Sequence, residues 1–263
     1  MKMDLQLKGK SALILGGSKG LGRGVADALA AEGVAVAMVA RGQEALDRAV
    51  SEIASRGAKA VGFAADLANW PTLEAAANAA RKELGPIDIL LNNSGGPPPS
   101  GVAGVPAKVW EDQFQAMVMP LLRITDLLLG DMRARKWGRT LNIASVSVVE
   151  PIAAIGVSNT LRSAIVGWAK TLATEVARDG ITVNTLLPGA IKTDRIIQLN
   201  SAAAERQKIS IEEAIQRSAQ TIPVGRIGTP AEFGAVAAFL ASPLAAYVTG
   251  SLIRVDGGAL RSV

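Results

Sequence analysis

Leu13-Ile14-Leu15-Gly16-Gly17-Ser18-Lys19-Gly20-Leu21-Gly22 is the stretch that decides the fold. An apolar run leads directly into a glycine-rich turn, and a helix-forming segment follows. The glycines at 16, 20 and 22 let the backbone approach a pyrophosphate, and a helix amino terminus supplies N–H donors and positive potential. The spacing is G-x-x-x-G-x-G, which is neither the G-x-G-x-x-G dinucleotide fingerprint nor a P-loop. We therefore expect a strand, a phosphate-binding turn and a helix. The alternative is that the glycines form an ordinary tight turn that binds no phosphate.

The rest of the chain alternates between short apolar runs and helix-length segments. The runs include Ser11–Leu15, Val34–Ala40, Ile87–Leu91, Thr140–Ile143 and Ile181–Leu187, and the helical segments include Gly24–Glu32, Glu44–Arg56 and Thr72–Leu84. Apolar runs without polar alternation are typical of a parallel sheet that is covered on both faces. The pattern predicts an α/β protein with a single doubly wound parallel sheet, a Rossmann fold, with helices on both faces. No linker or repeat divides the chain, so we expect one domain over residues 1–263.

Composition excludes several classes of function. The chain has no cysteine and no histidine, so a thiolate nucleophile, a Ser-His-Asp triad and a zinc site are excluded, and we expect no metal. The net charge of +5 comes from scattered basic residues, and nine aromatic residues (four Trp, four Phe, one Tyr) are few for base stacking, so we expect no nucleic-acid partner.

The start of the chain does not resemble a signal peptide, and no apolar run approaches about 18 residues. We therefore expect a cytoplasmic protein without a membrane partner.

Further signals follow the glycine-rich stretch in chain order. They are Asp66-Leu67 after the third strand, Asn92-Asn93-Ser94-Gly95 after the fourth, Pro188-Gly189 and Thr193 after the sixth, then Val248-Thr249-Gly250 and Val255-Asp256-Gly257-Gly258. Together they span nearly the whole chain and resemble the classical short-chain dehydrogenase/reductase family. The resemblance implies an oxidoreductase that transfers hydride between a nicotinamide cofactor and a carbonyl or alcohol of a small organic substrate.

The resemblance also implies which residues contact the cofactor. The expected contacts are Gly16, Ser18, Lys19, Gly20, Leu21, Gly22, Arg41, Asp66, Leu67, Asn93, Gly95, Arg162, Pro188, Gly189, Ile191 and Thr193. By the same resemblance, Asp66 should position the adenine, and Asn92 should brace the sheet near the cofactor.

The end of the second run, Val39-Ala40-Arg41, bears on the choice of cofactor. An NAD enzyme usually has a carboxylate here for the ribose hydroxyls. Ala40 leaves no carboxylate to repel a 2′-phosphate, Arg41 offers a bidentate partner, and Lys19 offers a second positive charge. We therefore predict NADP(H); the alternative is that both basic side chains are solvated surface charges.

The catalytic positions depart from the family pattern. Ser145 matches the family's catalytic serine, but Ser158 stands where the tyrosine is expected and Arg162 where the lysine is expected. The stretch Gly167–Ala173 matches the following helix without gaps, which secures this alignment. The family's helix asparagine aligns with Met117. Ser145, Ser158 and Arg162 are therefore the candidate catalytic residues.

This substitution changes the chemistry that the site can perform. A serine hydroxyl is a much weaker acid than a phenol, whose pKa is about 10, so Ser158 is a poor direct replacement. Arg162 stays charged and cannot relay protons, but it can hold the ribose, stabilise an oxyanion or clamp a carboxylate or phosphate. Because spacing and positive charge are kept, we favour a divergent subgroup with Ser-Asn-x-x-Arg in place of Tyr-x-x-x-Lys. The alternative is that these side chains only pack and solvate a helix start.

The proton donor that replaces the tyrosine is left open. The candidates are Glu150, Lys192, Asp194 and a water held by Ser145 and Ser158. The chain's one tyrosine, Tyr247, lies where the family commonly has a structural aromatic residue.

The resemblance makes residues 191–222 a substrate lid, with an amphipathic stretch at Ile209–Ala219. It also suggests a homotetramer, or a homodimer, built through the helices around Leu121–Arg135 and Ser158–Ala177.

Two alternatives to an oxidoreductase are kept. One is a non-catalytic NADP(H)-binding sensor or partner subunit, because three of four catalytic positions differ; the other is a lyase that uses the same pocket.

Overall fold

The computed structural model describes residues 4–262, and its seven strands form one parallel sheet in the order β3-β2-β1-β4-β5-β6-β7. The strands are β1 (Ser11–Leu15), β2 (Ala35–Ala40), β3 (Ala60–Ala64), β4 (Ile89–Asn92), β5 (Gly138–Ile143), β6 (Ile181–Pro188) and β7 (Leu252–Val255). The predicted doubly wound parallel sheet is confirmed. The two edge strands, β3 and β7, were not among the named apolar runs, and all of their residues are half-buried or exposed.

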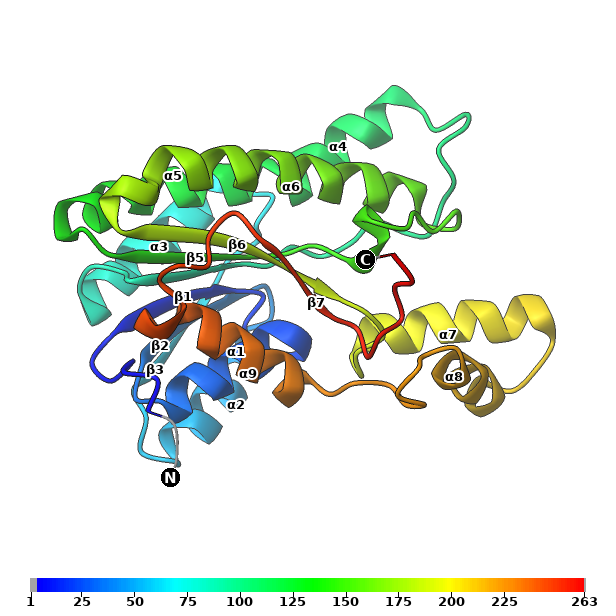
Figure 1. The fold of residues 1–263 in the computed structure, drawn as a ribbon, viewed down its shortest axis with the longest axis horizontal. Coiled ribbons are helices and arrows are strands. Elements are labelled where there is room, and N and C mark those ends of the chain that lie inside the picture. The colour runs from blue at the N-terminus through cyan, green and yellow to red at the C-terminus, as the bar shows by residue number, and fades with distance from the viewer. Residues whose placement is uncertain (1–3, 263) are drawn as a thin grey trace.

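Helices cover both faces of the sheet (Figure 1). They are α1 (Gly20–Ala31), α2 (Gln43–Ala54), α3 (Trp70–Leu84), α4 (Ala107–Met117), α5 (Met119–Arg135), α6 (Gly156–Val176), α7 (Asp194–Gln207), α8 (Ile211–Gln220) and α9 (Pro230–Ala241). One core cluster lies between the sheet and α3, α5 and α6, and the other lies between the sheet and α1, α2 and α9. The chain therefore folds as three layers, as the alternating sequence pattern predicts.

The strand β1 shows why the apolar runs lack polar alternation. Leu13 and Leu15 belong to one core cluster, whereas Ala12 and Ile14 belong to the other. Successive side chains of a strand point to opposite faces, so a strand between two helical layers must be apolar at every position. All five residues of β1 are accordingly buried.

The strand order places the candidate site. β1 pairs with both β2 and β4, so the direction of winding reverses between β1 and β4. Ligands of open α/β sheets bind outside the carboxyl ends of the strands at such a reversal. Gly16 after β1, Asn93 after β4 and Ser145 after β5 all lie at this edge.

The predicted lid region folds as a pair of helices, α7 and α8, that projects from the body of the fold (Figure 1). The predicted amphipathic stretch corresponds to α8, whose start is capped because the Ser210 side chain accepts a hydrogen bond from the Glu213 N–H. Only Asn200, Ala204 and Ala214 are buried in this pair. The small buried surface suits an element that moves relative to the core.

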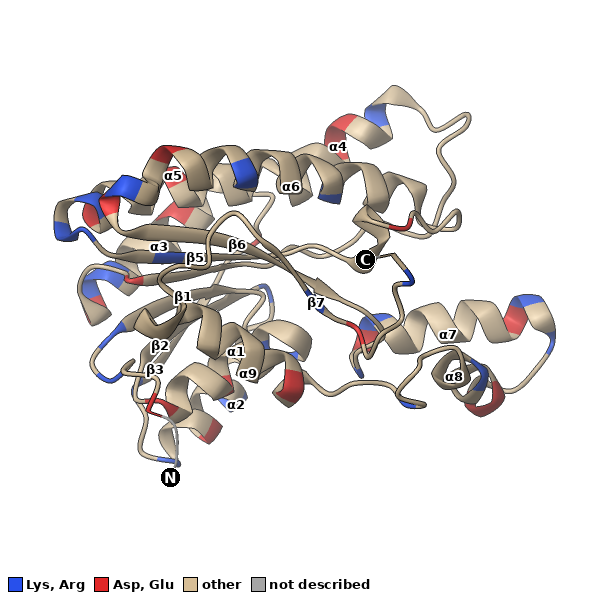
Figure 2. Cartoon of the chain, viewed as in Figure 1, with Lys and Arg blue, Asp and Glu red and all other residues tan. Residues whose placement is uncertain are grey.

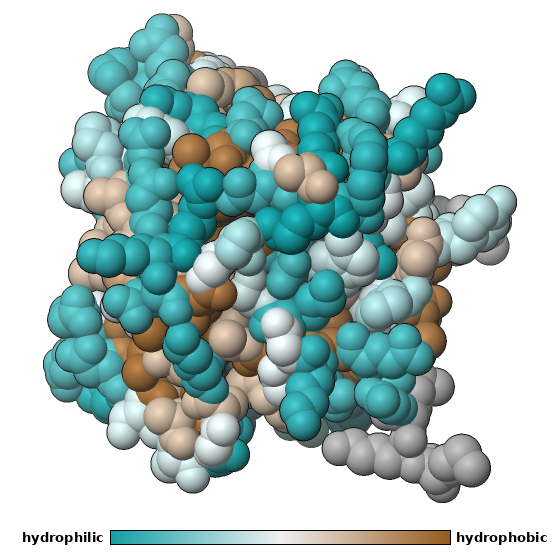
Figure 3. All heavy atoms as spheres, turned by 90° about the vertical axis from the view of Figure 1, so that its left-hand side faces the viewer, coloured by the Kyte–Doolittle hydropathy of each residue, from teal (hydrophilic) through white to brown (hydrophobic). Residues whose placement is uncertain are grey.

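The opposite end of the molecule, which faces the viewer in Figure 3, is mostly hydrophilic, with hydrophobic side chains in smaller areas. None of the helices formed by residues 4–262 is long and apolar enough to cross a membrane.

Candidate active site

The glycine-rich turn forms a cradle that is lined by backbone. Gly16 and Gly20 adopt positive φ angles of 64° and 60°. A Cβ atom on Gly22 would lie 2.2 Å from the carbonyl oxygen of Gly16, so a side chain there would collide with the backbone. Lys19 gives α1 no side-chain cap, which leaves the first N–H groups of the helix available to an anion.

Two other segments close around this cradle. The Asn93 side chain lies against Gly16, where an added Cβ would be 2.6 Å from Asn93 Nδ2, and Thr193 lies beside Gly20. The stretch that carries Pro188, Gly189, Ile191 and Thr193 is held in place by an isolated parallel bridge between Ile191 and Gly228. The structure therefore brings together the predicted contacts that follow β1, β4 and β6.

The two basic residues predicted to contact a phosphate differ in their surroundings. Arg41 is exposed at the end of β2 and has no hydrogen-bond or ion-pair partner among residues 4–262. Lys19 Nζ lies 2.5 Å from Asp194 Oδ2, and both side chains are largely exposed. Arg41 is thus free for a phosphate, whereas the charge of Lys19 is balanced within the protein. Asp66 is also exposed, and its carboxylate accepts a hydrogen bond from the Ala68 N–H.

The Arg162 guanidinium joins the ends of two strands. Its Nη1 donates to the Ile143 carbonyl oxygen at 3.1 Å, and its Nη2 donates to the Gly95 carbonyl oxygen at 3.0 Å. Its Nε donates to the Ser158 hydroxyl oxygen at 3.3 Å, and Ser158 is buried. Burial, and to a smaller extent the charge of Arg195, lowers the pKa of Arg162 to about 10, so the group stays charged at neutral pH.

Ser145 and Asn92 occupy the positions that the family pattern implies. Ser145 follows β5 in an extended conformation, is half-buried, and accepts a hydrogen bond from the Ser147 N–H at 3.1 Å. Asn92 Nδ2 donates to Thr125 Oγ1 and to Asn142 Oδ1, both at 2.9 Å. These two bonds tie β4 to α5 and β5, which is the bracing that the resemblance implied.

The remaining family position carries no polar group. Met117 is buried at the end of α4, where the chain turns into α5. A thioether cannot donate a hydrogen bond to a substrate or a water.

Two of the three charged candidates for the proton donor, Glu150 and Asp194, are engaged elsewhere, whereas Lys192 is exposed and has no side-chain partner among residues 4–262. Glu150 Oε1 accepts hydrogen bonds from the backbone N–H groups of Arg261 and Ser262, at 3.0 and 3.1 Å. Asp194 pairs with Lys19. Tyr247 is fully exposed. Of the candidates, Lys192, Ser158 and water therefore remain.

One functional candidate was missed by sequence reasoning. Arg195, in the first turn of α7, donates from Nη2 to the Pro97 carbonyl oxygen at 3.1 Å. A Cβ on Gly96 would lie 3.6 Å from Arg195 Nη2 and 3.8 Å from Arg162 Nη2. The two arginines are therefore neighbours, and the closeness of Arg195 to Thr193 in sequence was the available signal.

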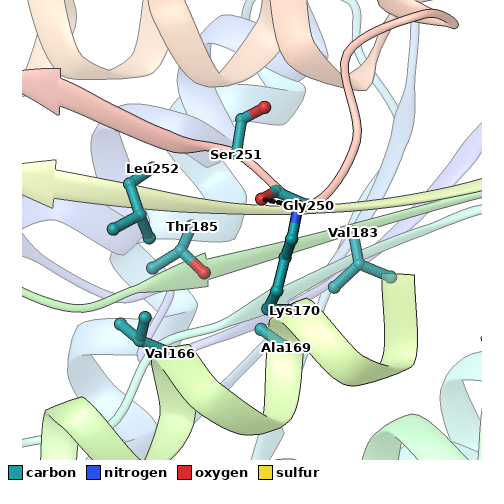
Figure 4. Close-up of a pocket in the computed structure, with 8 residues that line it drawn as sticks. All are labelled: Val166, Ala169, Lys170, Val183, Thr185, Gly250, Ser251 and Leu252. Atoms are coloured by element: carbon teal, nitrogen blue, oxygen red, sulfur yellow. Dashed lines mark hydrogen bonds between the residues drawn. The ribbon is translucent and has the colours of Figure 1, made fainter. Parts of the chain in front are cut away.

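Two surface hollows lie away from these residues. The first, of about 240 Å³, is formed by α6, β6 and the segment before β7, and in it Lys170 Nζ donates to the Gly250 carbonyl oxygen at 3.1 Å (Figure 4). The second lies between α4 and α6 and is lined in part by Trp110, Phe114 and Leu161. Neither hollow contains a predicted site residue. Among residues 4–262, no cluster of acidic side chains could hold a metal ion.

Comparison with known proteins gives matches along almost the whole chain. The sequence profile of the family described as enoyl-(acyl carrier protein) reductase matches residues 16–259. The 3-oxoacyl-(acyl-carrier-protein) reductase FabG of Vibrio cholerae is 34% identical over 256 residues, which are 97% of this chain and 98% of the relative.

Solved structures agree with the sequence matches. The L-sorbose reductase from Gluconobacter frateurii, solved with NADPH and L-sorbose, has a TM-score of 0.93 at 31% identity and covers 99% of this chain and 100% of its own. YwfH, an NADPH-dependent reductase involved in bacilysin biosynthesis, has a TM-score of 0.92 at 27% identity, with 97% of this chain and 99% of that chain covered. Because these matches cover almost the whole chain, the similarity includes α6 and the α7–α8 region.

Proposed function

The chain belongs to the classical short-chain dehydrogenase/reductase family, and from this premise we propose that it is an NADP(H)-dependent oxidoreductase with an atypical active site. The reaction is hydride transfer between the nicotinamide and a carbonyl or alcohol of a small organic substrate. The observation that carries this proposal is the intact cofactor cradle. It combines close backbone approaches at Gly16 and Gly22, uncapped N–H groups at the start of α1, and an Arg41 that has no partner among residues 4–262.

The residues of the cradle fit a dinucleotide that carries a 2′-phosphate. The pyrophosphate fits the start of α1, because helix N–H groups and the helix dipole favour an anion there. The 2′-phosphate fits Arg41, next to Ala40, where an NAD enzyme would usually have a carboxylate. The NADPH named for the two structural relatives supports the same choice.

The catalytic residues act through charge and hydrogen bonding. The nicotinamide supplies or accepts the hydride when the cofactor is bound. Ser145 donates a hydrogen bond to the substrate oxygen, and Arg162 stabilises negative charge that develops on it. The Ser158 oxygen already accepts from Arg162 Nε, so its hydroxyl hydrogen is free to point at a substrate oxygen or a water. Ser158, alone or through water, therefore takes the place of the family's tyrosine in a Ser-Asn-x-x-Arg subgroup.

The experiment that tests this proposal is a titration of the protein with NADPH and, in parallel, with NADH. We expect NADPH to bind about tenfold to a hundredfold more tightly, and Arg41→Ala to remove most of that preference. Arg178→Ala changes an exposed arginine outside the predicted site by the same charge and serves as the control. If neither dinucleotide binds, the oxidoreductase assignment is wrong.

A non-catalytic NADP(H)-binding protein is the second candidate, and Met117 is the observation that favours it. With an apolar side chain at the asparagine position and no tyrosine or lysine, the usual proton relay cannot form. This candidate requires tight NADPH binding without turnover on any ketone, aldehyde or alcohol of a broad panel.

We also propose that α7 and α8 form the substrate lid and that the protein is a homotetramer built through α5 and α6. The contact from Arg195 on α7 to the Pro97 carbonyl oxygen supports the lid, because it links α7 to the loop after β4. Light scattering on the purified protein tests the assembly, and a monomeric mass rules it out.

A further inference from the structure

Arg162 and Arg195 lie side by side, and the described part of the chain supplies no counter-ion to either. None of the ion pairs formed by residues 4–262 includes either of them. Their only partners in that part of the chain are the carbonyl oxygens of Ile143, Gly95 and Pro97 and the hydroxyl of Ser158. The charge of Arg195 also contributes to the lowered pKa of Arg162, so the two groups repel each other.

The acidic residues at this end of the sheet do not relieve the repulsion. Asp194, next to Arg195 in sequence, pairs with Lys19. Glu150 accepts backbone N–H groups of the carboxyl-terminal segment, and Asp256 accepts those of Gly258 and Leu260. Arg195 also stands in the first turn of α7, where the helix dipole disfavours a cation. Figure 2 shows the basic residues at the start of this helix, where it meets the body of the fold.

Many donors of the pair remain unused. A guanidinium has five N–H donors; Arg162 uses three of them within residues 4–262 and Arg195 uses one. Gly96 lies between the two groups and has no side chain to separate an anion from them. A carboxylate has two oxygens that accept charge-assisted hydrogen bonds, so one carboxylate matches both arginines.

We propose that Arg162 and Arg195 together bind a carboxylate of the substrate, so that the enzyme acts on an oxo acid or on the corresponding hydroxy acid. This inference rests on the proposed oxidoreductase function and names the substrate class of the same site. Arg195 is the specificity-determining residue, and because it lies on α7, binding of the acid also fixes the lid against the loop that holds Pro97.

A phosphate of the cofactor is the other anion that could meet these arginines. The position of Arg162 favours the substrate. Its partner Ile143 ends β5, and its partner Gly95 lies in the loop after β4. Ser158 is one turn away on α6, so the pair adjoins the proposed proton-donating group. The uncapped start of α1 already offers a separate place for the pyrophosphate.

Calorimetric titration in the presence of NADPH tests the proposal, with acetate and phenylacetate as carboxylate probes and phenylacetamide as the neutral counterpart. We expect the acids to bind to the wild type and the amide to bind much more weakly. Arg195→Gln should weaken acid binding about tenfold or more, and Arg195→Lys should weaken it less. Arg206→Gln is the control, because it removes one positive charge from an exposed position in the last turn of the same helix. That position is about 16 Å from Arg195 along the helix axis, so the affinity for the acids should be unchanged.

A separate titration with NADPH alone distinguishes the two anion sources and shows that each variant is folded. The proposal requires Arg195→Gln to bind NADPH as the wild type does. It is overturned if neither acid binds the wild type, if Arg195→Gln binds the acids normally, or if this variant loses NADPH affinity while keeping that for acids. Failure of the wild type to bind NADPH would instead remove the proposed function, independently of the acid result.

Discussion

Arg162 lies one helical turn after Ser158 on α6, and its Nε donates a hydrogen bond to the Ser158 hydroxyl oxygen at 3.3 Å. This bond links the two residues that we propose to stand in place of the family's tyrosine and lysine. It uses the serine oxygen as an acceptor, which leaves the serine proton to be donated outward. The two substitutions therefore form one coupled group, and they should be tested as such.

Ser158→Ala should lower kcat about a hundredfold, because it removes a positioned hydroxyl donor beside the reacting oxygen. The affinity for NADPH should change little, since Arg162 keeps its bonds to the Ile143 and Gly95 carbonyl oxygens. Ser163→Ala alters an exposed serine on the same helix and is the matched control. Steady-state rates on a reducible oxo acid check this, and an unchanged kcat would exclude Ser158 from proton delivery.

The pH profile of kcat/KM should be flat between about pH 7 and pH 9, because the chain has no histidine or cysteine to titrate there. Above that range it should fall. The pKa of Arg162 is lowered by burial to about 10, so the charge that stabilises the oxyanion is present below that value and lost as pH rises through it. Initial rates measured in overlapping buffers test this; a step near neutral pH would reveal an unassigned titrating group.

Much of the fold was predictable because each inner strand packs against helices on both faces of the sheet, so that both sets of its side chains must be apolar. In β1, one core cluster contains Leu13 and Leu15, and the cluster on the other face of the sheet contains Ala12 and Ile14. A run that is apolar at every position therefore identifies an inner strand even when the neighbouring strands are not known. The edge strands β3 and β7 do not follow this rule, because their residues are half-buried or exposed. Fold prediction from apolar runs is therefore strongest at the centre of the sheet.

The site was predictable only for those residues that follow the carboxyl end of a strand in the sequence. Gly16 and Asn93 come directly after a strand and Ser145 comes two residues after one, so their convergence follows from the parallel arrangement. The contacts that complete the site are long-range: 98 positions separate Arg195 from Pro97, and 175 separate Lys19 from Asp194. No local pattern encodes such pairs, which depend on how α7 packs against the strand ends.

Glu232→Gln should destabilise the protein at neutral pH and much less in acid. Glu232 closes a capping box at the start of α9 with Thr229 and pairs with Arg226. The Arg226 hydrogen bond, followed by those from Thr229, lowers the pKa of Glu232 from 4.5 to about 2. A lowered carboxyl pKa means that the stabilisation is full above pH 4.5 and is lost as pH falls toward 2. Thermal unfolding of both proteins across this window checks the prediction, with Glu111→Gln, an exposed carboxylate, as control.

Asp194→Asn should tighten NADPH binding by about twofold to fivefold at low salt. The substitution breaks the 2.5 Å ion pair between Asp194 and Lys19. The charge of Lys19 can then attract the cofactor phosphates beside the glycine-rich turn. The gain should shrink in about 0.5 M salt, since exposed charges are screened. Asp112→Asn breaks a comparably exposed pair with Lys108 on α4 and controls for the change in net charge. Fluorescence titration of NADPH separates the outcomes. Weaker binding in Asp194→Asn would mean that the pair itself holds α7 near the cofactor, so that Lys19 serves the lid and not the phosphate.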